Sequence, residues 1–170
     1  QLNKLLYGST DITTSLNAGY CQDATGLTIN ATPSGGTFSG AISTSNFDPS
    51  SLNSGYHNII YTYTDGNGCV NSDTTGTNIY PAAAAVITSN LGSNYCEDAN
   101  SINLTGYPSG GTWGGSGVTG TVFDPSQANL GSTDIVYYYT DGNGCTDNDT
   151  VSVTVNALPT VSHSALADEC

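Results

Sequence analysis

Cysteines are the residues of this 170-residue chain whose spacing most clearly suggests chemistry. Cys21 and Cys69 lie about 50 residues apart, and Cys96 and Cys145 repeat that spacing, which leaves Cys170. Four cysteines permit three pairings on sequence alone, and the simplest joins Cys21 to Cys69 and Cys96 to Cys145. Closing a loop of this length stabilises a small domain by roughly 3 to 4 kcal/mol in a chain-entropy treatment. We therefore expect two structural disulfides, with the partner of Cys170 further along the polypeptide.

Zinc binding and thiol catalysis are the alternatives for these cysteines. A zinc site needs four closely placed Cys or His ligands, whereas the chain has no Cys-x-x-Cys pair, and His57 and His163 stand at unrelated positions. No His recurs beside a Cys to act as the base for a thiol nucleophile. Disulfides are favoured, and they indicate an oxidising compartment, hence secretion or the cell surface.

Acidic and amide side chains gather around a recurring Asp-Gly-Asn-Gly segment, and their oxygen atoms are of the kind that binds Ca²⁺. The pattern lacks the sixth-position Gly and the final Glu of a helix-flanked calcium loop, and a tight hairpin turn already explains it. We prefer the turn and keep calcium as the alternative. The candidate calcium ligands are Asp65, Asn67 and Asp73, followed by Asp141, Asn143 and Asp149.

Other catalytic and binding arrangements are weaker. Serine is abundant, but no Gly-x-Ser-x-Gly elbow occurs, and the Pro-Ser-Gly-Gly-Thr segments lack the Lys of a phosphate-binding loop. Trp113 and Tyr138 are candidates for stacking on sugars, although Phe38 at the place equivalent to Trp113 favours a core ring instead. We expect a chain without catalytic residues and without a cofactor.

Short modification motifs are also present. Asn-x-Ser/Thr sequences begin at Asn30, Asn103 and Asn148, and Asp-Thr tripeptides place Thr74 and Thr150 at matching positions. Ordinary exposed loop and strand residues are the simpler interpretation of each motif.

Internal repetition organises all these residues. Its period of about 75 residues is too long for a solenoid unit and suits a small all-β domain with its own core. We expect repeat 1 over residues 1–80, repeat 2 over 81–158, and the start of a third repeat at 159–170. The repeated motifs are Tyr-Cys-x-Asp-Ala from Tyr20 and Tyr95, Pro-Ser-Gly-Gly-Thr-Phe/Trp from Pro33 and Pro108, Phe-Asp-Pro-Ser from Phe47 and Phe123, and Tyr-Thr-Asp-Gly-Asn-Gly-Cys from Tyr63 and Tyr139.

Strand patterns dominate each repeat. Ile59, Tyr61 and Tyr63 alternate along one face before the Asp-Gly-Asn-Gly turn, as do their counterparts in repeat 2. Val151, Val153 and Val155 alternate after the second turn, which predicts a terminal β-hairpin. Several short strands at turn-rich spacing predict an all-β chain of tandem immunoglobulin-like antiparallel β-sandwich modules, each with one disulfide.

Charge and hydropathy exclude two classes of partner. Fourteen acidic residues face one basic residue, so the net charge of -13 repels a nucleic acid backbone. No apolar stretch approaches the roughly 20 residues that cross a bilayer, so the chain is not membrane-embedded. The sequence starts without a Met and with no basic, then apolar leader, so we expect a mature or excised stretch of a longer protein.

Taken together, the repeated motifs resemble the tandem immunoglobulin-like or PKD-like repeats of large Bacteroidetes surface proteins, including gliding-motility adhesins. The resemblance covers both repeats. It implies export through the type IX secretion system and display at the outer surface. The Asp-Thr tripeptides resemble an O-glycosylation signal of the same phylum, with Thr74 and Thr150 as acceptors, which implies a glycoprotein.

We therefore expect a non-catalytic structural segment of a secreted adhesin, forming an extended filament or stalk for surface attachment or gliding. Its location would be extracellular, at a cell surface and attached to the outer membrane. Its partners would be neighbouring repeats of the same chain and the secretion or motility machinery, with no nucleic acid. The alternatives are accessory or carbohydrate-binding modules of a secreted hydrolase, and a self-assembling surface-layer or sheath subunit.

Overall fold

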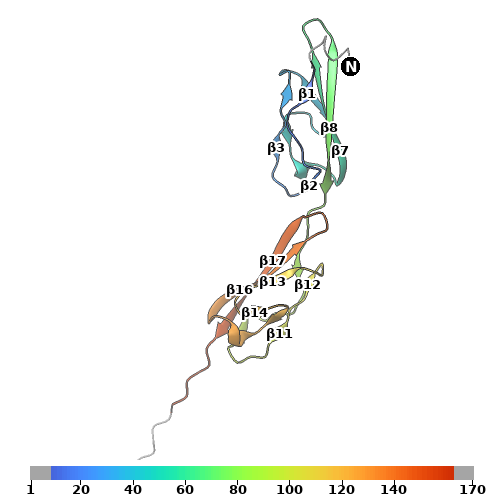
Figure 1. Cartoon of the computed structure of the whole chain (residues 1–170). Helices are drawn as coiled ribbons and strands as arrows, with labels where there is room; N and C mark the ends of the chain where they lie inside the picture. The colour runs from blue at the N-terminus through green and yellow to red at the C-terminus, as the bar shows by residue number, and fades with distance from the viewer. Residues whose placement is uncertain (1–8, 163–170) are drawn as a thin grey trace, which may run out of the picture. The chain divides into compact units, whose positions relative to one another are not determined.

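Two long β-hairpins, one in each repeat, are the largest elements of the chain. A computed structural model describes residues 9–162 and places β7 (Gly55–Thr64) against β8 (Val70–Tyr80), and β16 (Gly131–Thr140) against β17 (Thr146–Asn156). Both pairs are antiparallel along their full length (Figure 1). The predicted alternation and the terminal hairpins are confirmed. The side chains that this alternation buries include Ile59, Tyr61, Ile135, Tyr137, Val153 and Val155.

In repeat 1 the hairpin is the centre of a four-stranded sheet. The strand order is β2-β8-β7-β5, with β2 at Gly19–Cys21 and β5 at Thr37–Gly40. Facing it are two-stranded pieces, β3 (Leu27–Thr28) with β6 (Asn46–Phe47), and β1 (Asp11–Ile12) with β4 (Ala31–Thr32). A 3₁₀ helix at Pro49–Ser51 follows β6. Such layers form a small β-sandwich.

Repeat 2 has the same arrangement. Its four-stranded sheet has the order β10-β17-β16-β13, with β10 at Asn94–Cys96 and β13 at Thr112–Gly114. One of its smaller sheets again has two strands, the other has three instead of two, and a 3₁₀ helix at Pro125–Gln127 occupies the place of the first one. The remaining strands are β9 (Val86–Ile87), β11 (Ile102–Asn103), β12 (Gly106–Tyr107), β14 (Val118–Thr119) and β15 (Val122–Phe123).

One strand pair in each repeat departs from the predicted antiparallel sandwich. β2 runs parallel to the end of β8, so that Cys21 stands beside Tyr80. β10 runs parallel to β17 in the same way, with Cys96 beside Asn156. The fold class, all-β immunoglobulin-like sandwich modules, is confirmed with this mixed sheet edge. No helix within residues 9–162 is long and apolar enough to cross a membrane.

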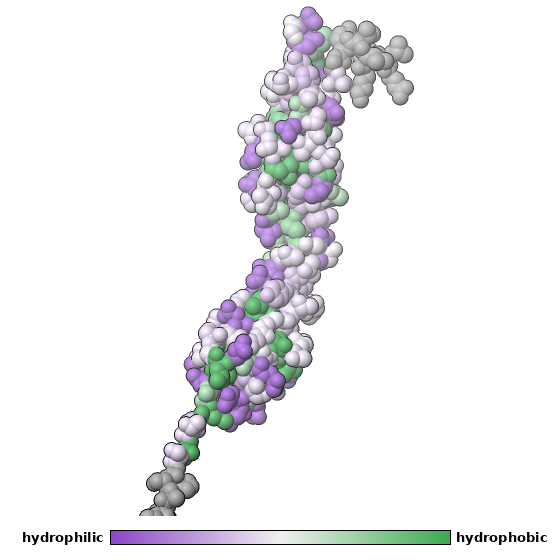
Figure 2. Space-filling model, turned by 60° about the vertical axis from the view of Figure 1, so that its left-hand side comes forward, coloured by the Kyte–Doolittle hydropathy of each residue, from purple (hydrophilic) through white to green (hydrophobic). Residues whose placement is uncertain are grey.

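Each repeat has a hydrophobic core of its own. Phe47 is fully buried among Ile29, Ile59 and Ile79 in repeat 1, and the ring of Tyr20 packs edge-on against it. In repeat 2, Phe123, Leu104, Ile135, Val153 and Val155 form the equivalent cluster. Figure 2 shows that hydrophobic side chains on the visible face are scattered among polar ones. The apolar residues of this polar chain are therefore concentrated inside the two sandwiches.

A tyrosine hydroxyl holds the Pro-Ser-Gly-Gly turn in each repeat. The Tyr61 hydroxyl accepts the Gly36 N–H at 2.7 Å and donates to the carbonyl of Pro33. In repeat 2, the Tyr137 hydroxyl accepts the Gly111 N–H at 2.9 Å and donates to Pro108. A Cβ at Gly36 would lie 2.5 Å from the Tyr61 ring, so this glycine is required by a close approach.

The chain divides into two compact units that do not coincide with the expected repeat boundaries. The first unit contains the residues up to Ala82 together with Gly142–Cys145, and the second contains Ala83–Asp141 and the residues from Thr146 onward. The turn of the second hairpin thus belongs to the first unit. The third repeat predicted at 159–170 falls mostly outside the described residues, Cys170 included.

Candidate functional site: cysteines and hairpin turns

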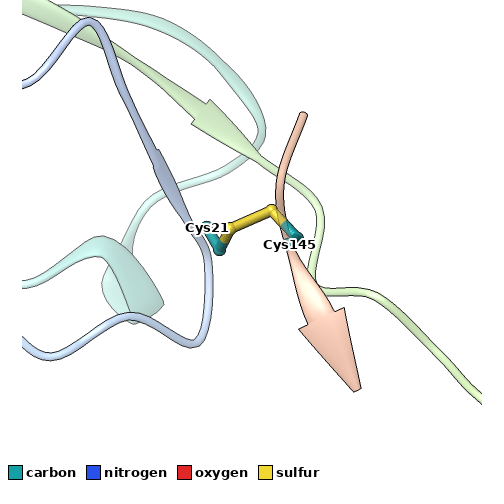
Figure 3. Close-up of a disulfide and its surroundings, with 2 residues drawn as sticks. All are labelled: Cys21 and Cys145. Atoms are coloured by element: carbon teal, nitrogen blue, oxygen red, sulfur yellow. A yellow bond between two sulfur atoms is a disulfide. The ribbon is translucent and has the colours of Figure 1, made fainter. Parts of the chain in front are cut away.

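A single disulfide is present among the described cysteines, and it joins the two repeats of the sequence. Cys21, at the end of β2, is bonded to Cys145, directly before β17, with a Cα–Cα distance of 5.6 Å (Figure 3). The two cysteines are 124 residues apart in the chain. Cys145 is fully buried. This bond explains why Gly142–Cys145 belongs to the first unit.

The predicted pairing within repeats, one disulfide each, is therefore wrong, and the length of the hairpin gives the reason. Cys21 lies beside Tyr80 at the end of β8, whereas Cys69 precedes Val70 at its start. A strand of 11 residues separates the two ends, which at about 3.3 Å per residue is roughly 35 Å. A disulfide requires Cα atoms within about 7 Å.

The same geometry separates Cys96 from Cys145 in repeat 2. Cys96 lies beside Asn156 at the end of β17, and Cys145 stands before its first residue. Both Cys69 and Cys96 carry free, exposed thiols in this structure. Each repeat thus presents one cysteine at either end of its long hairpin.

The Asp-Gly-Asn-Gly segment forms the predicted tight turn, organised by its first residue. The Asp65 Oδ1 atom accepts the backbone N–H groups of Asn67 and Cys69, each at 2.8 Å. Gly68 has φ +85°, which a side chain would strain. The hydrogen bond from the Cys69 N–H, followed by that from Asn67, lowers the pKa of Asp65 below its ordinary value. The turn carboxylate therefore fixes the backbone at the hairpin cysteine.

The residues predicted as calcium ligands are not brought together. Asp73 Oδ2 accepts the backbone N–H of Ile12 at 2.8 Å, and Asp149 Oδ2 accepts that of Ile87 at 2.8 Å. Each of these aspartates thus binds the first short strand of its repeat, and each is the fourth residue of the long strand that follows the turn containing Asp65 and Asn67, or Asp141 and Asn143. Within the described part of the chain, no group of three or more His, Cys, Asp or Glu side chains is arranged to hold a metal ion.

The two candidate sugar-stacking rings differ in exposure. The Trp113 ring lies 4.6 Å from that of Tyr137 and packs against the core of repeat 2, as the ring of Phe38 does against Tyr61 in repeat 1. Tyr138 is 50% exposed and lines a shallow depression of about 280 Å³ with Asp147 and Asn148. Of these two rings, Tyr138 is the accessible one.

The candidate glycosylation residues all lie on exposed backbone. Thr74 and Thr150 are exposed on β8 and β17, on the side opposite the buried alternation. Asn30, Asn103 and Asn148 are exposed as well. Attachment of sugar at any of these residues remains a prediction.

Two functional roles were missed from the sequence. The tyrosine hydroxyls hold the Pro-Ser-Gly-Gly turns, and the recurrence of a hairpin tyrosine 28 residues after Pro33 and 29 residues after Pro108 was a usable signal. The hydrogen bonds that Asp73 and Asp149 accept from backbone N–H groups were not predicted, since the sequence does not show which distant backbone a strand carboxylate contacts.

The geometry defines two immunoglobulin-like β-sandwich modules. No protein-family model and no curated protein matches the chain. Among solved structures, it is similar to fibronectin(III)-like modules of Clostridium thermocellum CbhA, with 14% identity and a TM-score of 0.39 over 91% of this chain and 99% of that one.

Two larger bacterial proteins are also similar, and the chain spans about half the length of each. One is a Bacteroides ovatus mixed-linkage glucan utilization protein, SGBP-B, solved with a heptasaccharide, at 15% identity and TM-score 0.32 over 88% of this chain and 48% of that one. The other is a Ca²⁺-stabilized ice-binding adhesin of an Antarctic bacterium, at 17% identity and TM-score 0.35 over 94% of this chain and 52% of that one.

Proposed function

We propose that this chain is a non-catalytic structural segment of a secreted bacterial cell-surface adhesin. Its modules form a stalk that holds a binding region away from the cell. The observation that carries the proposal is the Cys21–Cys145 bond, which links successive repeats instead of closing either one. A bond of this kind restrains how far two successive modules of one chain can separate.

Three further features support an extracellular role. A persistent disulfide is typical of secreted proteins and cell surfaces. The net charge of -13 and the high content of Ser, Thr and Asn favour solubility of a repetitive chain and oppose its non-specific aggregation. Each module also encloses its own core, so that modules can be added without rebuilding the fold.

The finer parts of this proposal rest on the resemblance of the repeated motifs to Bacteroidetes surface proteins. They are attachment to the outer membrane, export by the type IX system, a role in gliding, and O-glycosylation at Thr74 or Thr150. The partners would be neighbouring repeats and the secretion or motility machinery.

The test is to delete one repeat from the protein in the cells that produce it. Antibodies against the chain should label intact cells, and electron microscopy of the labelled cells should show that the antibody and a distal tag lie closer to the surface after deletion. Adhesion to the native surface should persist. Loss of adhesion with unchanged reach would contradict the stalk, and labelling only after lysis would contradict surface display.

Carbohydrate binding is the second candidate, because Tyr138 exposes an aromatic ring beside polar side chains. A glycan array probed with the whole chain tests it. Tyr138→Ala should then abolish any signal, whereas Tyr56→Ala, at an exposed tyrosine of the other hairpin, should leave it unchanged. Binding that survives Tyr138→Ala would assign the sugar to another surface.

A further inference from the structure

Each repeat carries two cysteines with distinct positions, which we call the opening cysteine and the hairpin cysteine. The opening cysteines are Cys21 and Cys96, and the hairpin cysteines are Cys69 and Cys145. The observed bond joins the opening cysteine of one repeat to the hairpin cysteine of the next. It leaves the complementary pair, Cys69 and Cys96, as free thiols.

The backbone at the free opening cysteine matches that at the bonded one. Cys21 and Cys96 both end a short strand parallel to the hairpin. In each case the next residue donates its N–H to the last residue of the long strand, at 2.8 Å and 2.9 Å. The residue three positions after each cysteine donates to the cysteine carbonyl, at 2.9 Å and 3.0 Å. Cys96 therefore already has the local conformation in which Cys21 is bonded.

The backbone at the free hairpin cysteine, Cys69, also matches that at the bonded one, Cys145. Its turn is held by the Asp65 carboxylate, and the glycine before each hairpin cysteine has nearly the same conformation, φ +85° at Gly68 and φ +88° at Gly144. The long strand that follows pairs with its partner in the same register in both repeats. Bond formation would thus require little change of backbone at either cysteine.

Burial separates the bonded cysteines from the free ones. Cys145 is fully buried, whereas Cys69 and Cys96 are exposed. Apolar side chains accompany the free thiols, since Val70, directly after Cys69, is 66% exposed. Near Cys96, Leu158 is 43% exposed and its N–H lies 3.2 Å from the side chain of Glu97, and Leu130 is 55% exposed at the same end of the sheet. Both free cysteines therefore have apolar surface available to a partner.

We propose that Cys96 and Cys69 are the two halves of further inter-repeat disulfides of the Cys21–Cys145 type. Cys96 bonds the hairpin cysteine of another repeat of this kind, and Cys69 bonds the opening cysteine of another. For the purified chain, the partner is a second copy, with Cys96 of one copy joined to Cys69 of the next. The contact is head-to-tail and open-ended, so it produces linear arrays.

The bond forms by thiol–disulfide exchange with a small disulfide such as glutathione disulfide. The Cys96 thiolate attacks one sulfur of the oxidant, releasing one glutathione thiolate and forming a mixed disulfide. The Cys69 thiolate of the partner then attacks the Cys96 sulfur and releases the second glutathione. Two cysteine thiols are oxidised, one glutathione disulfide is reduced to two thiols, and the two protons go to the released thiolates.

The experiment mixes two variants of the whole chain, both with Cys170→Ser to remove the remaining thiol. One also carries Cys69→Ser and keeps Cys96, and the other carries Cys96→Ser and keeps Cys69. After oxidation with glutathione disulfide, nonreducing electrophoresis and intact mass measure the heterodimer and the two homodimers. The heterodimer should be roughly tenfold more abundant than the two homodimers together. The same mixture oxidised in denaturant is the control, because unfolded chains pair at random.

Two results would overturn the proposal. One is a native mixture with the random proportions of the denatured control, and the other is a native mixture that stays monomeric. A chymotryptic map is the second measurement, since the single basic residue leaves trypsin too few sites, and it should contain a linked Cys69–Cys96 peptide. These outcomes do not depend on the proposed surface role, which fails separately if intact cells are not labelled.

Discussion

At the residue scale, the tyrosine hydroxyls of the two hairpins have the most specific role. Each hydroxyl lies between a glycine N–H and a proline carbonyl of the Pro-Ser-Gly-Gly turn, on a ring that is almost fully buried. Replacing such a tyrosine with a ring that lacks the hydroxyl leaves two backbone groups without a hydrogen-bond partner, which lowers the stability of the folded state. The turn is therefore held by a side chain of the core as well as by the conformation of its own glycines.

Tyr137→Phe should lower the free energy of unfolding of repeat 2 by about 1 to 3 kcal/mol, because it leaves the Gly111 N–H and the Pro108 carbonyl without their partner. Urea unfolding followed by Trp113 fluorescence measures this change. Tyr138→Phe, at the adjacent exposed tyrosine, is the control and should have almost no effect. Equal unfolding midpoints for the two variants would contradict the role of the hydroxyl.

Asp65 gives a pH dependence to the first hairpin turn. Its pKa is lowered in the folded chain by the N–H groups of Cys69 and Asn67, so the turn is favoured above the unfolded pKa and loses that contribution as the pH falls through the folded one. In an NMR titration, the amide signals of Asn67 and Cys69 should move together at a lower pH than that at which an ordinary aspartate titrates. Asp65→Asn should remove this transition. A midpoint above the ordinary aspartate value would show that the hydrogen bonds do not stabilise the carboxylate.

At the element scale, a carboxylate on each long strand ties the first short strand of its repeat to the sheet. Two-residue strands such as β1 and β9 have little pairing of their own. The hydrogen bonds that Asp73 accepts from the Ile12 N–H and Asp149 accepts from the Ile87 N–H supply the missing attachment.

Asp149→Ala should therefore loosen β9 while leaving the hairpin intact. We expect hydrogen exchange at Ile87 to accelerate, with little change in β16. Asn148→Ala, at the neighbouring exposed position, is the control. Exchange at Ile87 equal to that of the control would contradict the attachment.

Removal of metal distinguishes this role from the calcium alternative. Because Asp73 and Asp149 already accept backbone N–H groups, EDTA should leave the melting temperature unchanged. A melting temperature that falls with EDTA and recovers with added Ca²⁺ would instead assign these carboxylates to a metal ion.

The sequence predicts the hairpins well because their information is local. Ile59 and Tyr61 alternate with polar residues before a turn whose glycines permit the required φ values, and no distant residue is needed. The sequence predicts several short strands but not how they pair, because that pairing depends on distant groups, as with Ile87 and Asp149. The parallel pairing of β2 with the end of β8 is equally nonlocal. If this parallel pairing is not known, the spacing of the cysteines does not show that Cys21 and Cys69 lie at opposite ends of β8.

At the scale of the whole molecule, the Cys21–Cys145 bond restrains most of the chain. Closing a loop of 124 residues stabilises the folded state by about 4 to 5 kcal/mol in the chain-entropy treatment.

Cys21→Ser and Cys145→Ser should lower the melting temperature equally, because both remove the same bond. Cys69→Ser and Cys96→Ser are the matched controls and should leave the monomer's melting temperature unchanged. A reducing agent should bring the wild-type chain to the value of the first two variants and leave those variants unaffected. A loss of stability in Cys69→Ser would instead support pairing within a repeat.

The disulfide also decides which parts of the chain carry tension. If the chain is pulled from its two ends, force enters through the residues before Cys21, crosses the sulfur atoms to Cys145, and leaves through β17. The 124-residue segment between the cysteines is bypassed, so roughly 420 Å of extensible polypeptide stays locked until the bond is reduced. In an oxidising environment, most of both modules can therefore unfold without the chain becoming longer by that amount.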